Sequence, residues 1–276
     1  MNTGVYFDRI NAKIHSGDLD GAIADLTKTI QLQPDDAKAY GVRGYAEQIK
    51  GDLDGAIADD TKTIDLKPND AFPYNNRGIS KQAKGDNDGA IADSTKAIQL
   101  KPDFANAYYS RGIAKQAKGD KDGAIADFTK AIDFKQDYAV AYVMRGCAKE
   151  AKGDLEGAIA DFTKVIELKP DAADAYCNRG STKQSKGDND GAIADCTKAI
   201  QLRPDFFYAY NNRGVAKNAK GDLDGAIADY SKAIQIEPDF ADAYQNRAIT
   251  KKAKGDLDGA NADFTKVHEL QLGSSK

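Results

Sequence analysis

A Gly-Asp pair recurs every 34 residues along this sequence, with no insertion or deletion between copies. The eight copies are Gly17-Asp18, Gly51-Asp52, Gly85-Asp86, Gly119-Asp120, Gly153-Asp154, Gly187-Asp188, Gly221-Asp222 and Gly255-Asp256. A fixed period of this length is typical of a chain that stacks one supersecondary unit many times. Such a chain buries its apolar surface between neighbouring repeats. The 276 residues therefore need not form the two globular domains that length alone suggests.

Residues 139–172 show what one repeat contains. Residues 139–152 predict a first helix, which Gly153 ends because glycine accepts the backbone of a tight turn. Asp154 is placed to cap a second helix, which ends near Leu168, before a proline. Asp171 then stands where it could cap the first helix of the next repeat. We therefore predict an all-α fold of antiparallel helix pairs joined by short loops.

Four residue columns keep fixed positions within the repeat. The aromatic column is Tyr6, Tyr40, Tyr74, Tyr108, Tyr142, Tyr176, Tyr210 and Tyr244. The small-residue column is Gly44, Gly78, Gly112, Gly146, Gly180 and Gly214, with Ile10 and Ala248 in the end repeats. The alanine column of the second helix is Ala22, Ala56, Ala90, Ala124, Ala158, Ala192, Ala226 and Ala260. The proline column is Pro34, Pro68, Pro102, Pro170, Pro204 and Pro238.

These columns and their period resemble the tetratricopeptide repeat (TPR) family over nearly the whole chain. The resemblance implies a right-handed α-α superhelical solenoid of eight helix-turn-helix repeats, in one domain over residues 1–276. The expected repeats are 3–36, 37–70, 71–104, 105–138, 139–172, 173–206, 207–240 and 241–274.

Two further columns depart from the family because they are charged. Arg occupies one position in every repeat: Arg9, Arg43, Arg77, Arg111, Arg145, Arg179, Arg213 and Arg247. Lys follows four residues later in all but the second repeat, which has Glu47. Residues four apart lie on the same face of a helix, so these two cations repel each other unless a nearby anion pairs with them. Asp in every second helix can do so, and we predict an Arg–Asp pair in each repeat, for example between Arg145 and Asp161.

In TPR proteins the first helices line a concave groove, and the residues just after the Tyr column vary here from repeat to repeat. Amide side chains prevail among them, and amides match the donors and acceptors of an extended peptide backbone. Four Asn residues recur at one position of the repeat: Asn76, Asn178, Asn212 and Asn246. They are similar to the asparagine ladder in the TPR domain of O-linked N-acetylglucosamine transferase, and that resemblance implies a peptide groove. The candidate peptide-binding residues are Asn75, Asn76, Tyr109, Asn178, Asn211, Asn212, Gln245 and Asn246.

Other interpretations of these features stay open. The amides could simply keep a solvated face polar. In the last repeat, Asn261 and His268 replace Ile and resemble a polar terminal cap. An exposed end could instead stack on another copy, so the alternative function is a scaffold that self-associates head to tail. The carboxylate clamp of chaperone-tail TPR domains is not visible, because Ile79 follows Asn75 in the clamp positions.

Composition disfavours other classes of protein. A net charge of -4 argues against nucleic acid as the main partner. No apolar run reaches membrane-spanning length and no leader peptide is visible, so we expect a cytoplasmic protein without a membrane partner. The three cysteines and two histidines show no metal-site spacing, and no nucleophile motif occurs. We expect no catalysis, no metal and no cofactor, and assign the chain as a protein-interaction adaptor or scaffold.

Overall fold

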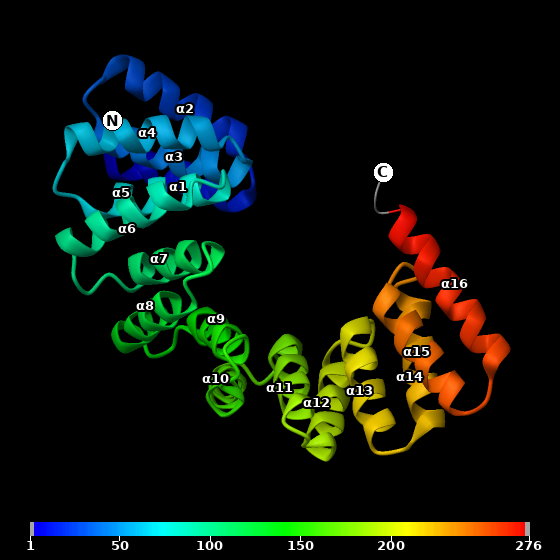
Figure 1. Ribbon diagram of the computed structural model, residues 1–276. Helices are drawn as coiled ribbons and strands as arrows, with labels where there is room; N and C mark the ends of the chain where they lie inside the picture. The colour runs from blue at the N-terminus through cyan, green and yellow to red at the C-terminus, as the bar shows by residue number, and fades with distance from the viewer. Residues whose placement is uncertain (1–2, 274–276) are drawn as a thin grey trace. The chain divides into compact units, whose positions relative to one another are not determined.

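The structure is a computed structural model that describes residues 3–273, and these residues form sixteen α-helices and no strand. The prediction of an all-α fold of paired helices is confirmed (Figure 1). The helices are α1 Thr3–Ser16, α2 Leu19–Leu32, α3 Ala37–Lys50, α4 Leu53–Leu66, α5 Ala71–Ala83, α6 Asn87–Leu100, α7 Ala105–Ala117, α8 Lys121–Phe134, α9 Ala139–Glu150, α10 Leu155–Leu168, α11 Ala173–Ser185, α12 Asn189–Leu202, α13 Phe207–Ala219, α14 Leu223–Ile236, α15 Ala241–Ala253 and α16 Leu257–Gly273.

Contacts divide the chain into two compact units, Met1–Ala141 and Tyr142–Lys276. In the first unit, each first helix packs on the second helix of its own repeat and of the preceding one, as in the series α5, α6, α7 and α8. The second unit shows the same order from α10 to α16. Because these helices are covered mainly by their sequence neighbours, each unit has an elongated core.

The Gly-Asp pair forms the turn inside each helix pair, as predicted. In the third repeat, Gly85 has φ +87°, a left-handed value that suits glycine. The Gly85 N–H donates to the Gln82 carbonyl, and the Asp86 N–H donates to the Lys81 carbonyl, so the end of α5 is satisfied. The Asp86 carboxylate then accepts from the Gly89 N–H at 2.8 Å and caps α6. One dipeptide therefore ends the first helix and begins the second.

Capping of the first helices differs from the expectation for Asp171. The N-cap of α11 is Ala172, which offers no side-chain hydrogen bond, so the predicted Asp171 cap is wrong. The capping position is the second residue after the proline. It holds Asp36 before α3 and Asp70 before α5, and both cap their helices. Asp171 lies one residue too early to reach the free N–H groups of α11.

The small-residue column marks where the two helices of a repeat approach closely. A Cβ atom built on Gly112 would lie 2.7 Å from Cε1 of Phe128, which is fully buried between the helices. Phe162 and Tyr230 stand in the same relation to Gly146 and Gly214. The glycine of the first helix therefore makes room for the ring of the second, and together they set the spacing of the pair.

The predicted Arg–Asp pair is present in repeats two to eight. Nε and Nη2 of each Arg donate to the two carboxylate oxygens of the Asp sixteen residues later, over 2.6–3.0 Å. The same Asp residues are no more than 5% exposed. Each Arg also lies near the ring of its Tyr, as Arg145 does at 5.4 Å from the centroid of Tyr142.

The Lys column and a hydroxyl column extend this arrangement. In the third repeat, Lys81 Nζ lies 2.8 Å from Asp93 Oδ2. The carboxylate of Asp93 therefore pairs with both Lys81 and Arg77. Arg77 Nη1 donates over 3.1 Å to Thr61 Oγ1 in the preceding repeat. Thr27, Thr95, Thr163, Thr197 and Ser231 accept the corresponding bonds from Arg43, Arg111, Arg179, Arg213 and Arg247. The Arg side chain therefore ties three successive helices together.

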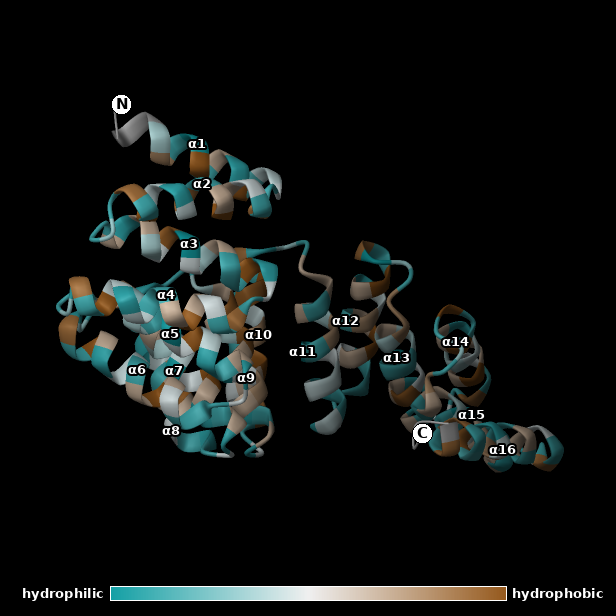
Figure 2. Ribbon diagram, turned by 90° about the horizontal axis from the view of Figure 1, so that it is seen from above, coloured by the Kyte–Doolittle hydropathy of each residue, from teal (hydrophilic) through white to brown (hydrophobic). Residues whose placement is uncertain are grey.

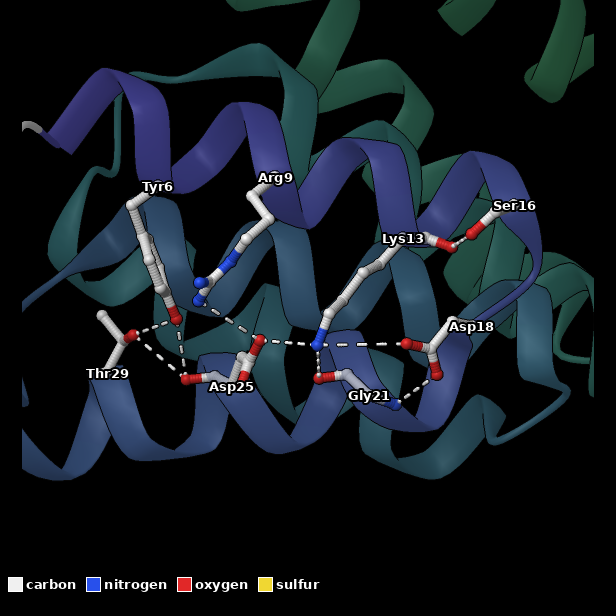
Figure 3. A network of polar contacts seen from close by, with 8 residues as sticks. All are labelled: Tyr6, Arg9, Lys13, Ser16, Asp18, Gly21, Asp25 and Thr29. Atoms are coloured by element: carbon white, nitrogen blue, oxygen red, sulfur yellow. Dashed lines mark hydrogen bonds and ion pairs between the residues drawn. The ribbon is translucent and has the colours of Figure 1, made fainter.

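The first repeat has a looser version of this arrangement, which Figure 3 shows between α1 and α2. Lys13 Nζ lies 2.8 Å from Asp25 Oδ2, whereas Arg9 Nη2 is 3.6 Å from the same atom and its side chain is 64% exposed. The Tyr6 hydroxyl lies 2.7 Å from Thr29 Oγ1 and 2.9 Å from the Asp25 carbonyl oxygen, to which it can donate. Lys13 is thus the closer partner of Asp25.

The second repeat has an excess of buried carboxylates. Glu47 stands in the Lys column, and Asp60 stands where Phe128 and Phe162 lie in later repeats. Asp60 is 1% exposed and Glu47 is 8% exposed. Burial raises the pKa of Glu47 to about 7 and that of Asp60 to about 8, and the negative charge of Asp59 adds to both shifts. The charge of this repeat therefore changes near neutral pH.

The helices alternate hydrophilic and hydrophobic residues along their length (Figure 2). Within residues 3–273, none combines the length and the apolarity that crossing a bilayer requires.

Candidate functional site

The candidate peptide-binding residues lie on the first helices, which also contact one another directly. In the first unit α5 contacts α7, and in the second unit α11 contacts α13, which contacts α15. The candidates divide between the units. Asn75, Asn76 and Tyr109 belong to the first unit, and Asn178, Asn211, Asn212, Gln245 and Asn246 belong to the second.

A cavity in the second unit holds two of the candidates. It encloses about 640 Å³ beside α11 and α13 and the loop that follows α12. Asn178 and Asn212 both line it, together with Cys177. The two amides come from neighbouring repeats, 34 residues apart, so the repeat period places them along one cavity.

The two amides have different partners. Asn212 Nδ2 donates over 3.4 Å to Sγ of Cys177, which orients that amide. Asn178 has no side-chain hydrogen bond to any residue that the structure describes, so its amide is available to a ligand. Burial raises the pKa of Cys177 to about 11, so its thiol is neutral and unreactive at physiological pH.

The remaining candidates of the second unit form a second contact between first helices. Asn246 Nδ2 of α15 donates to Asn211 Oδ1 of α13 over 3.0 Å. Asn211 is only 7% exposed, so it joins two repeats and does not present its side chain on the surface. Asn246 is half-buried and Gln245 is exposed. Neither lines the cavity that holds Asn178 and Asn212.

In the first unit, a cavity of about 360 Å³ brings together Asn75 and Tyr109. Asn75 is 3% exposed, and its Oδ1 accepts no hydrogen bond from any described residue. The ring of Tyr109 lies 5.3 Å from that of Tyr138. Asn76 stays outside this cavity, and its backbone carbonyl accepts from Gln48 Nε2 at 3.2 Å.

Sequence reasoning missed several residues of the larger cavity. Arg203 and Phe206 lie in the loop after α12, and Tyr208 lies in the first turn of α13. Arg203 Cζ lies 3.5 Å from the centroid of Phe206, and its Nη2 donates to Asp174 Oδ1 at 2.6 Å. The available signal was that Arg203 breaks a loop column in which the four preceding repeats have Lys. Glu150, likewise, replaces the Gln of neighbouring repeats.

The charged groups of the described residues do not gather into a metal centre. Among residues 3–273, no group of three His, Cys, Asp or Glu side chains is arranged to hold a metal ion. The clustered carboxylates of the repeats are instead bonded to Arg and Lys, as Asp93 is to Arg77 and Lys81. The two cavities offer hydrogen bonding and apolar contact, and the one beside α11 and α13 also has charged groups in its lining.

Family models described as tetratricopeptide repeat or TPR repeat match most of the chain. Their matches cover residues 7–71, 81–119, 105–138, 146–185, 173–206 and 216–255. Among curated protein sequences, no significant match is found.

Solved structures of similar fold include the protein MamA, 30% identical, over 59% of this chain and 96% of that chain, with a TM-score of 0.54. YrrB, described as a TPR protein with an unusual peptide-binding site, is 26% identical over 67% of this chain and 95% of its own, with a TM-score of 0.59. A TPR protein from Parabacteroides merdae is 19% identical over 85% of this chain and 93% of its own, with a TM-score of 0.67, and shows the fold alone.

Proposed function

Because the chain belongs to the tetratricopeptide repeat family, a family of interaction modules, we propose that it is a scaffold that binds an extended peptide segment of a partner protein along its first helices. The observation that carries the proposal is the 640 Å³ cavity at which Asn178 and Asn212 meet. A peptide backbone presents one N–H and one carbonyl per residue, and two amides from successive repeats can pair with such a strand.

The similarity to YrrB supports the proposal, since that protein has a peptide-binding site by its description. The cavity also has the mixed lining that ligand sites use. Phe206, Phe207 and Tyr208 supply apolar area, and the amides supply orientation. The thiol of Cys177 is neutral and buried, and the Asp of the neighbouring Arg–Asp pair, Asp195, is bonded to Lys183, so neither supplies a nucleophile or a free base at this cavity.

The test is peptide selection followed by a matched pair of variants. Peptides selected from a random display library on the wild-type protein are titrated against the double variant Asn178→Ala/Asn212→Ala. The control is Gln201→Ala, which removes an exposed amide of α12 outside the cavity. We expect the double variant to lose about tenfold or more in affinity, as two lost hydrogen bonds imply, and the control to match the wild type. Equal affinity of all three proteins would refute the site.

Self-association through the last helix is the second candidate. Phe264 stands in the column of Phe128, Phe162 and Tyr230, which are at most 1% exposed, yet it is 38% exposed. Leu257 of the same helix is 58% exposed. Another copy packed on α16 would bury these side chains. Light scattering over a range of concentrations tests this, because a constant monomer mass would rule the candidate out.

A further inference from the structure

We infer that the cavity beside α11 and α13 selects a peptide segment that carries a basic side chain, Lys or Arg. This inference rests on the proposed function and adds the chemistry of the ligand. It starts from the charges around the cavity. Three carboxylates line it, those of Glu150, Asp174 and Asp205, against the single guanidinium of Arg203. One carboxylate is already paired with that guanidinium, at 2.6 Å between Asp174 Oδ1 and Arg203 Nη2.

The two remaining carboxylates have no cation of their own. Neither Glu150 nor Asp205 forms an ion pair with a residue in the described part of the chain. Glu150 is half-buried at the end of α9, where its Oε1 lies 2.8 Å from Thr182 Oγ1, whose single proton can go to this oxygen or to the Asn178 carbonyl at 2.9 Å. This contact orients the carboxylate and leaves its other oxygen to accept. A fixed, partly desolvated carboxylate attracts a ligand cation more strongly than a mobile surface one.

Glu150 is also a departure from the repeat pattern. The same position holds Gln48, Gln82, Gln116, Gln184 or Asn218 in five other repeats. In the first unit, Gln48 Nε2 donates to Ser80 Oγ of the next repeat, so the neutral residue can form the corresponding bond to a hydroxyl. The bond between repeats therefore does not require an acid at this position. The negative charge of Glu150 is an addition at this cavity alone among these repeats.

The aromatic side of the cavity suits the stem of a basic side chain. Tyr208 is 51% exposed, and its ring stacks with that of Phe207 at 4.2 Å between centroids. Lys and Arg lay their aliphatic stems on such rings and keep the charged group at a polar edge. Here that edge carries Asp205, which immediately precedes the aromatic run.

Arg203 has a different use in this arrangement. Its Nε is buried and donates to no described residue, although Nη2 is held by Asp174. The Nε atom is covered by the protein, but the side chain as a whole is 39% exposed, so its other N–H groups can donate to a peptide carbonyl. Arg203 therefore contacts the backbone of the segment, while Glu150 and Asp205 contact its basic side chain.

One cavity of the first unit, the one lined by Asn75 and Tyr109, provides an internal comparison. Its lining contains amides, hydroxyls, Ile79 and Ile113, and no charged side chain. Tyr138 is neutral at physiological pH, and burial raises its pKa further, to about 12. Two cavities built from the same repeat thus differ in charge. Glu150 and Asp174 lie at positions that vary between repeats, whereas Asp205 stands in a column that is Asp in most repeats.

The test uses fluorescein-labelled extended peptides that share one neutral sequence, taken from those selected on the wild-type protein, and differ only in a central Lys, Gln or Glu. Fluorescence anisotropy gives the affinity of each. We expect the Lys peptide to bind the wild-type protein about tenfold more tightly than the Gln peptide, and the Glu peptide to bind most weakly. Glu150→Gln should remove most of the Lys preference and leave the Gln peptide unaffected. Circular dichroism confirms that each variant is folded.

Two further variants make the result specific. Asp205→Asn changes an exposed loop residue and should also reduce the Lys preference. Glu167→Gln makes the same change of charge as Glu150→Gln on the exposed face of α10, outside the cavity, and should change nothing. Equal binding of the Lys and Gln peptides, or tightest binding of the Glu peptide, would overturn this inference and leave the proposed function standing. Failure of every peptide to bind would refute both.

Discussion

Arg145 Nη2 donates to Asp161 Oδ1 over 2.6 Å, while Nε donates to Oδ2 over 3.0 Å. This two-point bond joins the helices of the fifth repeat, and Lys149 Nζ reaches the same carboxylate at 2.8 Å. The family usually has apolar residues where this chain has its Arg and Lys columns. The cations are compatible with the fold because one buried Asp pairs with both the Arg and the Lys of its repeat.

Removing that carboxylate should be costly. Asp161→Ala leaves Arg145 and Lys149 without their anion, and we expect a loss of about 3–5 kcal/mol in the free energy of unfolding. Asp171→Ala is the matched control, since Asp171 is exposed and caps no helix, and we expect it to change stability by less than about 0.5 kcal/mol. Urea titration followed by circular dichroism measures both. A shift for Asp161→Ala as small as that of the control would show that the pair contributes little.

Two glycines should respond in opposite ways to alanine. Gly112→Ala places a methyl group 2.7 Å from the buried ring of Phe128, and we expect a loss of about 1–3 kcal/mol. In Gly41→Ala the new methyl group lies at ordinary contact distance, 3.6 Å from Thr63 Oγ1. The gain in helix propensity should then stabilise the protein by about 0.5–1 kcal/mol. Thermal melts of the two variants would contradict the packing described here if both moved in the same direction.

Stability should fall as the pH rises from 5 to 8. Glu47 and Asp60 have folded-state pKa values of about 7 and about 8, above their unfolded values of about 4. The folded state therefore holds protons that the unfolded state has lost, and this contribution disappears as the pH rises through the folded pKa values. The lowered pKa values of Asp25 and Asp263 act in the opposite direction, but only at more acidic pH.

Asp60→Asn tests this account of the second repeat. The amide has the shape of the carboxyl group and no charge, so the variant should be more stable than the wild type at pH 8, by about 1–3 kcal/mol. It should also show a weaker dependence on pH. Urea midpoints at pH 5 and pH 8 provide both comparisons. A variant with the full wild-type dependence on pH would show that Asp60 does not titrate in this range.

The features that repeat could be predicted, because each appears eight times in the sequence. The turn at Gly85-Asp86 and the bond between Arg145 and Asp161 follow from residue type and spacing alone. The capping by Asp171 failed because it depends on a shift of one residue in a loop. Regular spacing predicts contacts within a helix pair better than it predicts loop geometry.

The site was less predictable, because it depends on how successive first helices face each other. Asn211 and Asn212 are adjacent in sequence, yet one is buried between repeats and the other lines a cavity. Arg203 lies in a loop, outside the helix columns that guided the prediction. The prevalence of amide side chains just after the Tyr column was visible in the sequence. The structure was needed to show which of these amides a ligand can reach.

The most direct test of the account is to locate the bound peptide. A selected peptide that carries a photoreactive side chain is cross-linked to the wild-type protein, and the modified residues are identified by mass spectrometry. We predict adducts in α11 and α13 and in the loop that contains Arg203 and Phe206, with little modification of the second helices α12 and α14. Adducts concentrated on α12 and α14, or spread evenly over the chain, would contradict the assignment of this cavity as the peptide-binding site.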